Sequence, residues 1–442
     1  MAILFIVLTV ILGFYMAWNI GANDVANSMA DAVGSGSCTI RQAVIAAGVC
    51  EFAGAVLVGA HVTDTVRKGI VEPNALASLP HMTEAQGAAL LVIGMLSALL
   101  AAAMWLHIAT FLGMPVSTTH SIVGAVAGFG VVAAGWSAVH WDKMGQIVLS
   151  WFISPILGGI MSFFLFKLIS GIILGSDRPT RAATRYAPYL FFFTGLVVVL
   201  SIVFKGLNHL IAEDRLFWMT NSISFAIAVL LGIFMAIFSR LYLSKKLSLF
   251  FRVPLSEQLE KVERVFAPLV FITSCTVAFA HGANDVANAV GPLAAVAEIL
   301  RSGNVYMKVH VPMWVLILGG CGIVTGLAMY GYRVMTTVGT KITVITPSRG
   351  LAADISAMTV VLICSRLKLP ISTTHTLVGA ILGVGFARGL GAVNKQVTRN
   401  IFGSWFITVP AAALLAILLF LAGRIFLMDQ IADVIQSQAL TG

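Results

Sequence analysis

The residues of greatest chemical interest lie in the segment IGANDVANSMAD, residues 20–31, which follows a mostly apolar stretch without a charged side chain. On a helix, Asn23 and Asn27 share one face and Asp24 lies beside them. No Lys or Arg lies within a helical turn of Asp24. Because a carboxylate in apolar surroundings needs a compensating charge, we interpret the cluster as ligands for a cation taken from solution.

The same pattern returns in the second half of the chain, because GANDVAN occurs at residues 21–27 and again at residues 282–288. Taken singly, an Asn could form a hydrogen bond between helices and an Asp could be half of a buried ion pair. The second carboxylate, Asp285, again has no Lys or Arg within a helical turn. Two such carboxylates at matching positions favour a pair of functional half-sites.

A second repeated pattern places hydroxyl side chains after a proline: PVSTTH begins at Pro115 and PISTTH at Pro370. Proline disfavours helix before it, and Ser or Thr after it caps the N-terminus of a helix that follows. A helix that starts inside an apolar region presents free N–H groups, hydroxyls and the positive end of its dipole, which together bind anions. The alternative is that these hydroxyls merely hydrogen-bond to carbonyls of their own helix.

Together the two patterns supply carboxylates, carboxamides, hydroxyls and two helix N-termini, with no arginine among them. An anion alone would be repelled by Asp24 and Asp285, whereas cations between the carboxylates and the anion would remove this repulsion. Each ligand would then raise the affinity for the other, which is the reciprocal coupling that symport requires. His120 and His375, which end the two PxSTTH patterns, are candidates for proton carriers or for hydrogen bonds behind the site.

The composition of the 442 residues identifies the class of protein, since 59% of them are apolar, 10% are charged and the mean hydropathy is +0.97. Apolar stretches of roughly 20 residues, long enough to cross a bilayer, recur along the chain. The net charge of +9 comes from basic residues in short loops between these stretches. Such charges set topology and meet lipid headgroups, so they do not indicate nucleic-acid binding. We expect an all-α polytopic membrane protein.

Three motif pairs recur in one order, the third being SWFISP from Ser150 and SWFITVP from Ser404. They divide the chain into a first repeat, a two-helix insert, a second repeat and a tail, at residues 1–175, 176–261, 262–428 and 429–442. Basic residues flank the insert, so both flanks should be cytoplasmic, and the acidic tail should lie outside together with the N-terminus. The repeats would then be inverted, as in secondary transporters that bind their substrate near the bilayer midplane.

These motifs, together with TVRKGIV, TVGTKITVITPSRG and RNIFGSWFITVP, resemble the inorganic phosphate transporter (PiT) family over nearly the whole chain. The resemblance implies inverted repeats with about twelve membrane segments, including half-helices, and a homodimer in the cell membrane. It implies a transporter, not an enzyme, that imports phosphate with Na⁺ or H⁺ and needs no further cofactor. The segment TVGTKITVITPSRG is more similar to Na⁺-coupled members, which favours Na⁺ as the coupling ion.

The resemblance also assigns roles to individual residues. The phosphate-binding residues would be Asp24, Asn27, Ser117, Thr118, Thr119, Asp285, Asn288, Ser372, Thr373 and Thr374. The Na⁺ ligands would be Asn23, Asp24, Thr119, Asn284, Asp285 and Thr374. Glu51 matches a functionally important family glutamate, whereas Asp64 and Asp354 stand where relatives often have glutamate. For these three, as for His120 and His375, we expect a role behind the site or in gating.

Three other functions are compatible with parts of the pattern. An H⁺-coupled phosphate permease or a sulfate permease would have the same fold, since both anions are tetrahedral. An intramembrane hydrolase would use Asp24 and Asp285 as an acid and base that share a proton, but it has no use for the two anion-binding helix starts. An anion channel would need no closed site with carboxylates.

Overall fold

The computed structural model describes residues 1–59, 70, 82–203, 217–305, 311–366 and 371–439, and their regular structure is entirely helical. Asp64, which the sequence marked for a role behind the site, lies outside the described residues. The helices of the first half are α1 (Ala2–Asp24), α2 (Ala26–Gly34), α3 (Ile40–Val58), α6 (Glu84–Phe111), α7 (Thr118–Ala134), α8 (Trp141–Ile169) and η3 (Ser170–Leu174). The insert follows with α9 (Pro179–Ile202), α11 (Phe217–Leu247) and η5 (Ser248–Phe250).

The second half repeats the order of the first. Its helices are α12 (Leu255–Asp285), α13 (Ala287–Ser302), α14 (Met313–Thr336), η6 (Thr337–Lys341), α15 (Pro347–Arg366), α16 (Thr373–Ala387) and α17 (Lys395–Ala439). Within the described residues, ten helical segments are long and apolar enough to cross a membrane, and α7 and α16 are shorter apolar helices. These twelve segments confirm the all-α fold with about twelve membrane segments.

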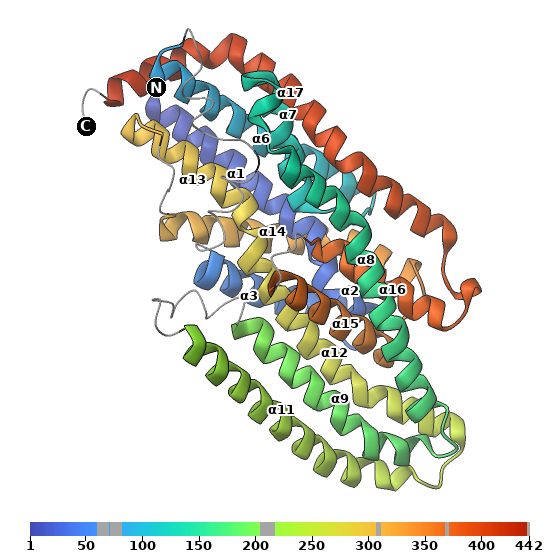
Figure 1. Cartoon of the computed structure of the whole chain (residues 1–442). Helices are drawn as coiled ribbons and strands as arrows, with labels where there is room; N and C mark the ends of the chain where they lie inside the picture. The colour runs from blue at the N-terminus through green and yellow to red at the C-terminus, as the bar shows by residue number, and fades with distance from the viewer. Residues whose placement is uncertain (60–69, 71–81, 204–216, 306–310, 367–370, 440–442) are drawn as a thin grey trace.

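The two halves are interleaved, because helices of one half pack against helices of the other. Helix α1 packs against α14 and α12 packs against α3, while α8 packs against α16 and α17 against α7 (Figure 1). Glycines make these contacts close: a Cβ at Gly21 of α1 would overlap the carbonyl of Ile323 in α14, and a Cβ at Gly282 of α12 would overlap the carbonyl of Glu51 in α3. Small residues are what lets helix backbones approach in a membrane.

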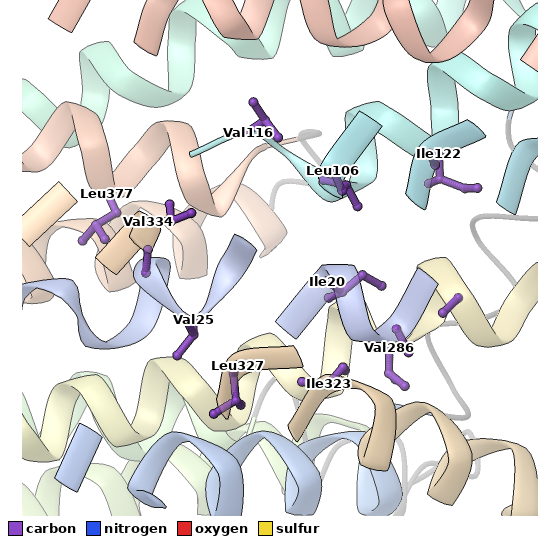
Figure 2. Packing of buried hydrophobic residues seen from close by; sticks show 14 of the residues in the cluster. Ile20, Val25, Leu106, Val116, Ile122, Val286, Ile323, Leu327, Val334 and Leu377 are labelled. Atoms are coloured by element: carbon purple, nitrogen blue, oxygen red, sulfur yellow. The ribbon is translucent and has the colours of Figure 1, made fainter. Parts of the chain in front are cut away.

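Each GANDVAN motif breaks its helix at the valine and not at the glycine. Val25 separates α1 from α2 and Val286 separates α12 from α13, although both keep right-handed helical dihedral angles. Figure 2 shows both valines among apolar side chains, including Ile323 and Leu327 of α14. Gly21 and Gly282 lie inside regular helix and serve helix packing.

The surface and the ends of the molecule fit a protein that spans a bilayer. Large apolar side chains are exposed along α8, α11 and α17, for example Phe164, Phe234 and Phe406. In Figure 1 the start of α1 and the end of α17 lie at one end of the molecule. The basic flanks of the insert, at the start of α9 and the end of α11, lie at the opposite end. Charge counting predicts this separation, and which end faces the cell interior stays a prediction.

Candidate functional site

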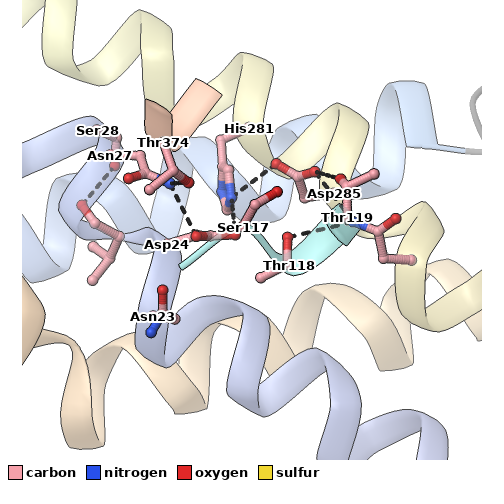
Figure 3. Close-up of polar contacts among 12 residues, drawn as sticks. Asn23, Asp24, Asn27, Ser28, Ser117, Thr118, Thr119, His281, Asp285 and Thr374 are labelled. Carbon is pink, nitrogen blue, oxygen red and sulfur yellow. Dashed lines mark hydrogen bonds and ion pairs between the residues drawn. The ribbon is translucent and has the colours of Figure 1, made fainter. Parts of the chain in front are cut away.

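The first half-site joins the GANDVAN motif of the first half to the PxSTTH motif of the second. The Asn27 amide nitrogen donates to Asp24 Oδ1 at 2.9 Å and lies 2.7 Å from the Thr374 hydroxyl oxygen (Figure 3). All three side chains are buried. Asp24 ends α1, Asn27 lies in the first turn of α2, and Thr374 lies in the first turn of α16. The break at Val25 thus places a carboxylate and a carboxamide beside the start of a half-helix.

The second half-site joins the GANDVAN motif of the second half to the PxSTTH motif of the first. The Asn288 amide nitrogen lies 3.3 Å from Asp285 Oδ1 and 3.2 Å from the Thr119 hydroxyl oxygen. The Thr118 hydroxyl lies 3.5 Å from the same amide nitrogen (Figure 3). The structure therefore brings both candidate carboxylates, two of the carboxamides and three of the hydroxyls into one buried cluster.

The serine of each PxSTTH motif caps the helix that follows it. Ser117 Oγ accepts from the backbone N–H of His120, and Ser372 Oγ accepts from that of His375, both at 3.3 Å. Both serines have extended backbone dihedral angles and precede the first residues of α7 and α16. Their hydroxyl oxygens are thus used by the backbone, which leaves the remaining N–H groups of the first turn as the candidate anion-binding element.

A histidine that the sequence analysis missed lies at the centre of the cluster. His281 Nε2 is 3.3 Å from Asp24 Oδ2 and 3.0 Å from Asp285 Oδ2 (Figure 3). Its Nδ1 is 3.4 Å from Glu51 Oε1, and its side chain is buried. The second motif reads HGANDVAN where the first reads IGANDVAN, so His281 replaces Ile20. This single departure from the repeat was the signal that could have identified it.

Glu51 lies at the cluster and not at a distant gate. Its side chain is fully buried on α3, and Oε1 faces both His281 and the hydroxyl of Ser28, the latter at 3.5 Å. Its second oxygen, Oε2, has no hydrogen-bond partner among the described residues. Three carboxyl groups therefore surround one imidazole, and within the described chain no Lys or Arg pairs with Asp24 or Asp285. A bound cation would offset this excess of negative charge.

Asn23 serves the structure around the site instead of pointing into it. Its amide nitrogen donates to the Thr110 hydroxyl and to the Met114 carbonyl, both at 3.0 Å, and its oxygen accepts from the Val116 N–H at 3.1 Å. These bonds fix the segment that leads into α7. Both ends of the carboxamide are thus hydrogen-bonded to protein groups, and the assignment of Asn23 as a cation ligand stays a prediction. Asn284, its counterpart, is half-buried.

The two motif histidines pack against aromatic rings and do not reach the carboxylates. The rings of His120 and His375 lie edge to face with centroids 5.0 Å apart. His375 stacks on Trp405 at 3.7 Å, and His120 lies 5.7 Å from the ring of Trp151. The indole N–H of Trp405 donates to the Pro115 carbonyl at 3.1 Å. These contacts join the starts of α7 and α16, which supports a role behind the site and gives the histidines no direct path to the cluster.

The remaining predicted residues lie at the edge of the site or apart from it. Thr373 is half-buried and lines a cavity of about 40 Å³ together with Asn27 and His281. Asp354 is buried on α15, where it accepts from the Thr273 hydroxyl and belongs to a different polar group. The cluster itself contains Asp24, His281 and Asp285, whose ligand atoms lie within 4.8 Å of one another, close enough to share one metal ion.

The chain is similar to known proteins along almost its entire length. The sequence model described as the phosphate transporter family matches residues 20–416. A protein from Pyrococcus furiosus that carries the name of a phosphate permease is 47% identical, over 94% of this chain and 96% of its own length. The Arabidopsis thaliana protein named inorganic phosphate transporter 2-1, chloroplastic, is 43% identical, over 93% of this chain and 70% of its own length.

A solved structure described as the sodium-dependent phosphate transporter has the same fold. It matches with a TM-score of 0.79 and 42% identity, over 96% of this chain and 100% of that chain. These relatives are named as transporters or permeases, so the alternative of an intramembrane hydrolase is excluded. With its family model, its relatives and its fold in agreement, the chain belongs to the phosphate transporter family.

Proposed function

We propose that this protein imports inorganic phosphate by symport with Na⁺, and that it does so by alternating access around the buried cluster. The observation that carries the proposal is that each half-site is built from residues of both halves. Asn27 of the first half contacts Thr374 of the second, and Asn288 of the second contacts Thr119 of the first, each beside a carboxylate. A ligand bound here touches both halves, so relative movement of the halves changes its access to solvent.

The donors in the cluster suit a tetrahedral oxyanion. Amide nitrogens of Asn27 and Asn288, hydroxyls of Thr118, Thr119 and Thr374, and the first-turn N–H groups of α7 and α16 can all donate to anion oxygens. None of these donors carries a fixed positive charge. An anion held by neutral donors can be released again, which a transport cycle requires.

The carboxylates supply the coupling to a cation. Asp24 and Asp285 would repel a phosphate ion that bound alone, whereas Na⁺ ions held by their oxygens would attract it. Phosphate and Na⁺ would then strengthen each other's binding by the same factor. Because moving one elementary charge is worth about 2.3 kcal/mol per 100 mV, an excess of bound Na⁺ lets an inside-negative potential drive import.

The comparison with the solved relative, which is described as sodium-dependent, supports Na⁺ over H⁺ as the coupling ion. The segment TVGTKITVITPSRG, which resembles Na⁺-coupled members, forms η6 and the start of α15. Helix η6 packs against α2, the helix that carries Asn27. The segment is thus placed to influence the first half-site without contributing a ligand to it.

Uptake into proteoliposomes tests the proposal. The purified protein, reconstituted into vesicles, is given labelled phosphate under an inward Na⁺ gradient, under a pH gradient without Na⁺, or under neither. We expect accumulation only with the Na⁺ gradient and little competition from excess sulfate at constant ionic strength. Uptake driven by the pH gradient alone would instead support the H⁺-coupled alternative. Block by sulfate would support a sulfate permease, and electrogenic flux without a cation gradient would support a channel.

The proposal includes a homodimer in the cell membrane, with both chain ends outside. The start of α1 and the end of α17 lie at one end of the molecule, opposite the basic flanks of the insert (Figure 1). Positive charge of this kind favours the cytoplasmic side, which puts the ends outside. Labelling of single cysteines introduced near residue 2 and near residue 437 by a membrane-impermeant reagent in whole cells checks this orientation.

Replacing His281 with glutamine should weaken the action of Na⁺ more than the folding of the protein. The imidazole faces Asp24, Asp285 and Glu51 from a single position, and a shorter-reaching amide cannot contact all three. We expect the Na⁺ concentration for half-maximal uptake to rise about 5-fold or more, within the usual range for coupling between sites. Uptake as a function of Na⁺ measures this shift.

The matched control is His140→Gln, which makes the same change outside the cluster, just before α8. It should leave the Na⁺ dependence of uptake as in the unaltered protein. If His281→Gln takes up phosphate with the same Na⁺ dependence as the unaltered protein, His281 does not position the carboxylates.

A further inference from the structure

A second pair of buried carboxyl groups lies outside the phosphate cluster. Asp31 is on α2, one helical turn beyond Asn27, and Asp354 is on α15. Each is 1% exposed. Helix α2 belongs to the first half and α15 to the second, and the two helices pack against each other. The pair therefore bridges the two halves at a contact that the candidate phosphate site does not use.

In the described part of the chain, hydroxyl groups donate hydrogen bonds to Asp354 but not to Asp31. Asp354 Oδ2 accepts from the Thr273 hydroxyl at 2.6 Å and from the Ser274 hydroxyl at 3.3 Å, both on α12. Neither Asp31 oxygen has a donor among the described residues. Asp31 faces the same side of α15 as Asp354, because a Cβ at Gly350, one helical turn before Asp354, would lie 3.5 Å from Asp31 Cβ. Two carboxylates only accept, so a bond between them requires a proton on one of them.

Among the described residues, no Lys or Arg forms an ion pair with Asp31 or Asp354. Many titratable groups on the elements packed against α2 and α15 have other partners. They include Asp24, Glu51, His281 and Asp285 in the cluster, Glu263 at Thr346 and Ser348, Glu260 with Arg264, Arg333 at the Phe111 carbonyl, Arg349 at the Val344 carbonyl, Lys167, Arg181, Arg185 and Lys261 over aromatic rings, His375 on Trp405, and Lys341 at the surface.

We propose that Asp31 and Asp354 form a proton-binding site, separate from the phosphate cluster, which holds one shared proton between the two halves. Two adjacent carboxylates buried without a counter-ion repel each other strongly, whereas an acid and a carboxylate attract. One proton, taken from solution, converts the first arrangement into the second. The Thr273 and Ser274 hydroxyls both donate to Oδ2 of Asp354 and stabilise negative charge on that oxygen.

The site gives protons control over the contact between α2 and α15. With the proton bound, the pair holds α2, and therefore Asn27, against the second half. With the proton lost, repulsion favours separation of the two helices. This inference does not rest on the identity of the transported anion, because it concerns a contact between two side chains outside the phosphate cluster.

Infrared spectroscopy of the full-length protein in lipid vesicles, without Na⁺ or phosphate, tests the site. A protonated carboxyl group has a carbonyl stretching band distinct from that of a carboxylate. We expect Asp31→Asn and Asp354→Asn each to lose the same acid band entirely, because a single proton is shared. In either variant the introduced amide can donate to the remaining carboxylate, which keeps the helices in contact and the protein folded.

The matched control, Asp429→Asn, changes an exposed aspartate near the end of α17 and should keep the band. The double variant should lose no more than either single variant. An unchanged acid band in both single variants would overturn the proposal. A loss of only half the band in each single variant would also overturn the proposal, because it would mean that each carboxyl group holds its own proton. The readout contains no transport step, so failure of the phosphate proposal leaves this test intact.

Discussion

Replacing either Asp24 or Asp285 with asparagine is expected to abolish most Na⁺-driven phosphate uptake while the protein still folds. Each change keeps the size of the side chain and removes one negative charge from a buried cluster. Without that charge, bound Na⁺ is less stable and phosphate loses its attraction to the site. We expect the mutual enhancement of Na⁺ and phosphate binding, typically about 5- to 150-fold between coupled sites, to be largely lost.

The measurement is phosphate binding to the purified protein with and without Na⁺, followed by uptake into vesicles. Asp429→Asn provides the control, because it makes the same substitution on an exposed part of α17. Size-exclusion profiles of all three variants should match that of the unaltered protein. If Na⁺ activates phosphate binding equally in Asp24→Asn, Asp285→Asn and the control, the carboxylates are not the cation ligands.

Alanine at Gly21 or Gly282 is expected to unfold or misassemble the protein. In each case the new Cβ would overlap a backbone carbonyl of the facing helix, that of Ile323 or that of Glu51. Backbone cannot rotate out of the way as a side chain can, so the helices must separate. Overpacking typically costs about 1–3 kcal/mol, and we expect values at or above the top of this range. Thermal unfolding in detergent, followed by size-exclusion chromatography, measures the loss.

Gly145→Ala is the matched control, because a Cβ at that helical position on α8 meets no atom within 4 Å. It should unfold at the same temperature as the unaltered protein or slightly higher, since alanine favours helix. Equal thermal stability in Gly21→Ala and Gly282→Ala would show that α1 and α12 do not require close contact with their partners.

Features that depend on local sequence could be predicted. Apolar length identified the membrane helices, and proline followed by serine identified the starts of α7 and α16, where Ser117 and Ser372 are caps. The repeat of GANDVAN identified Asp24 and Asp285 as a pair, and the structure brings both to one imidazole. These inferences succeeded because capping and burial of a charge are decided within one or two helical turns.

Features that depend on which helices meet could not be predicted. Asn23 looked identical to Asn27 in type and face, yet its partners come from a segment about ninety residues away, as for Val116. His281 has no unusual local sequence apart from replacing Ile20. Asp31 became notable only when α15 brought Asp354 beside it. Pairing between distant segments is a tertiary property that spacing alone does not specify.

The exchange of partners between the halves limits how this chain can be divided. Asn27 depends on a threonine of the second half and Asn288 on one of the first, so neither half contains a complete set of ligands. Either half expressed alone would therefore lack part of the cluster. The two matching positions before GANDVAN are also not equivalent, because the first half has Ile20 where the second half has the imidazole of His281.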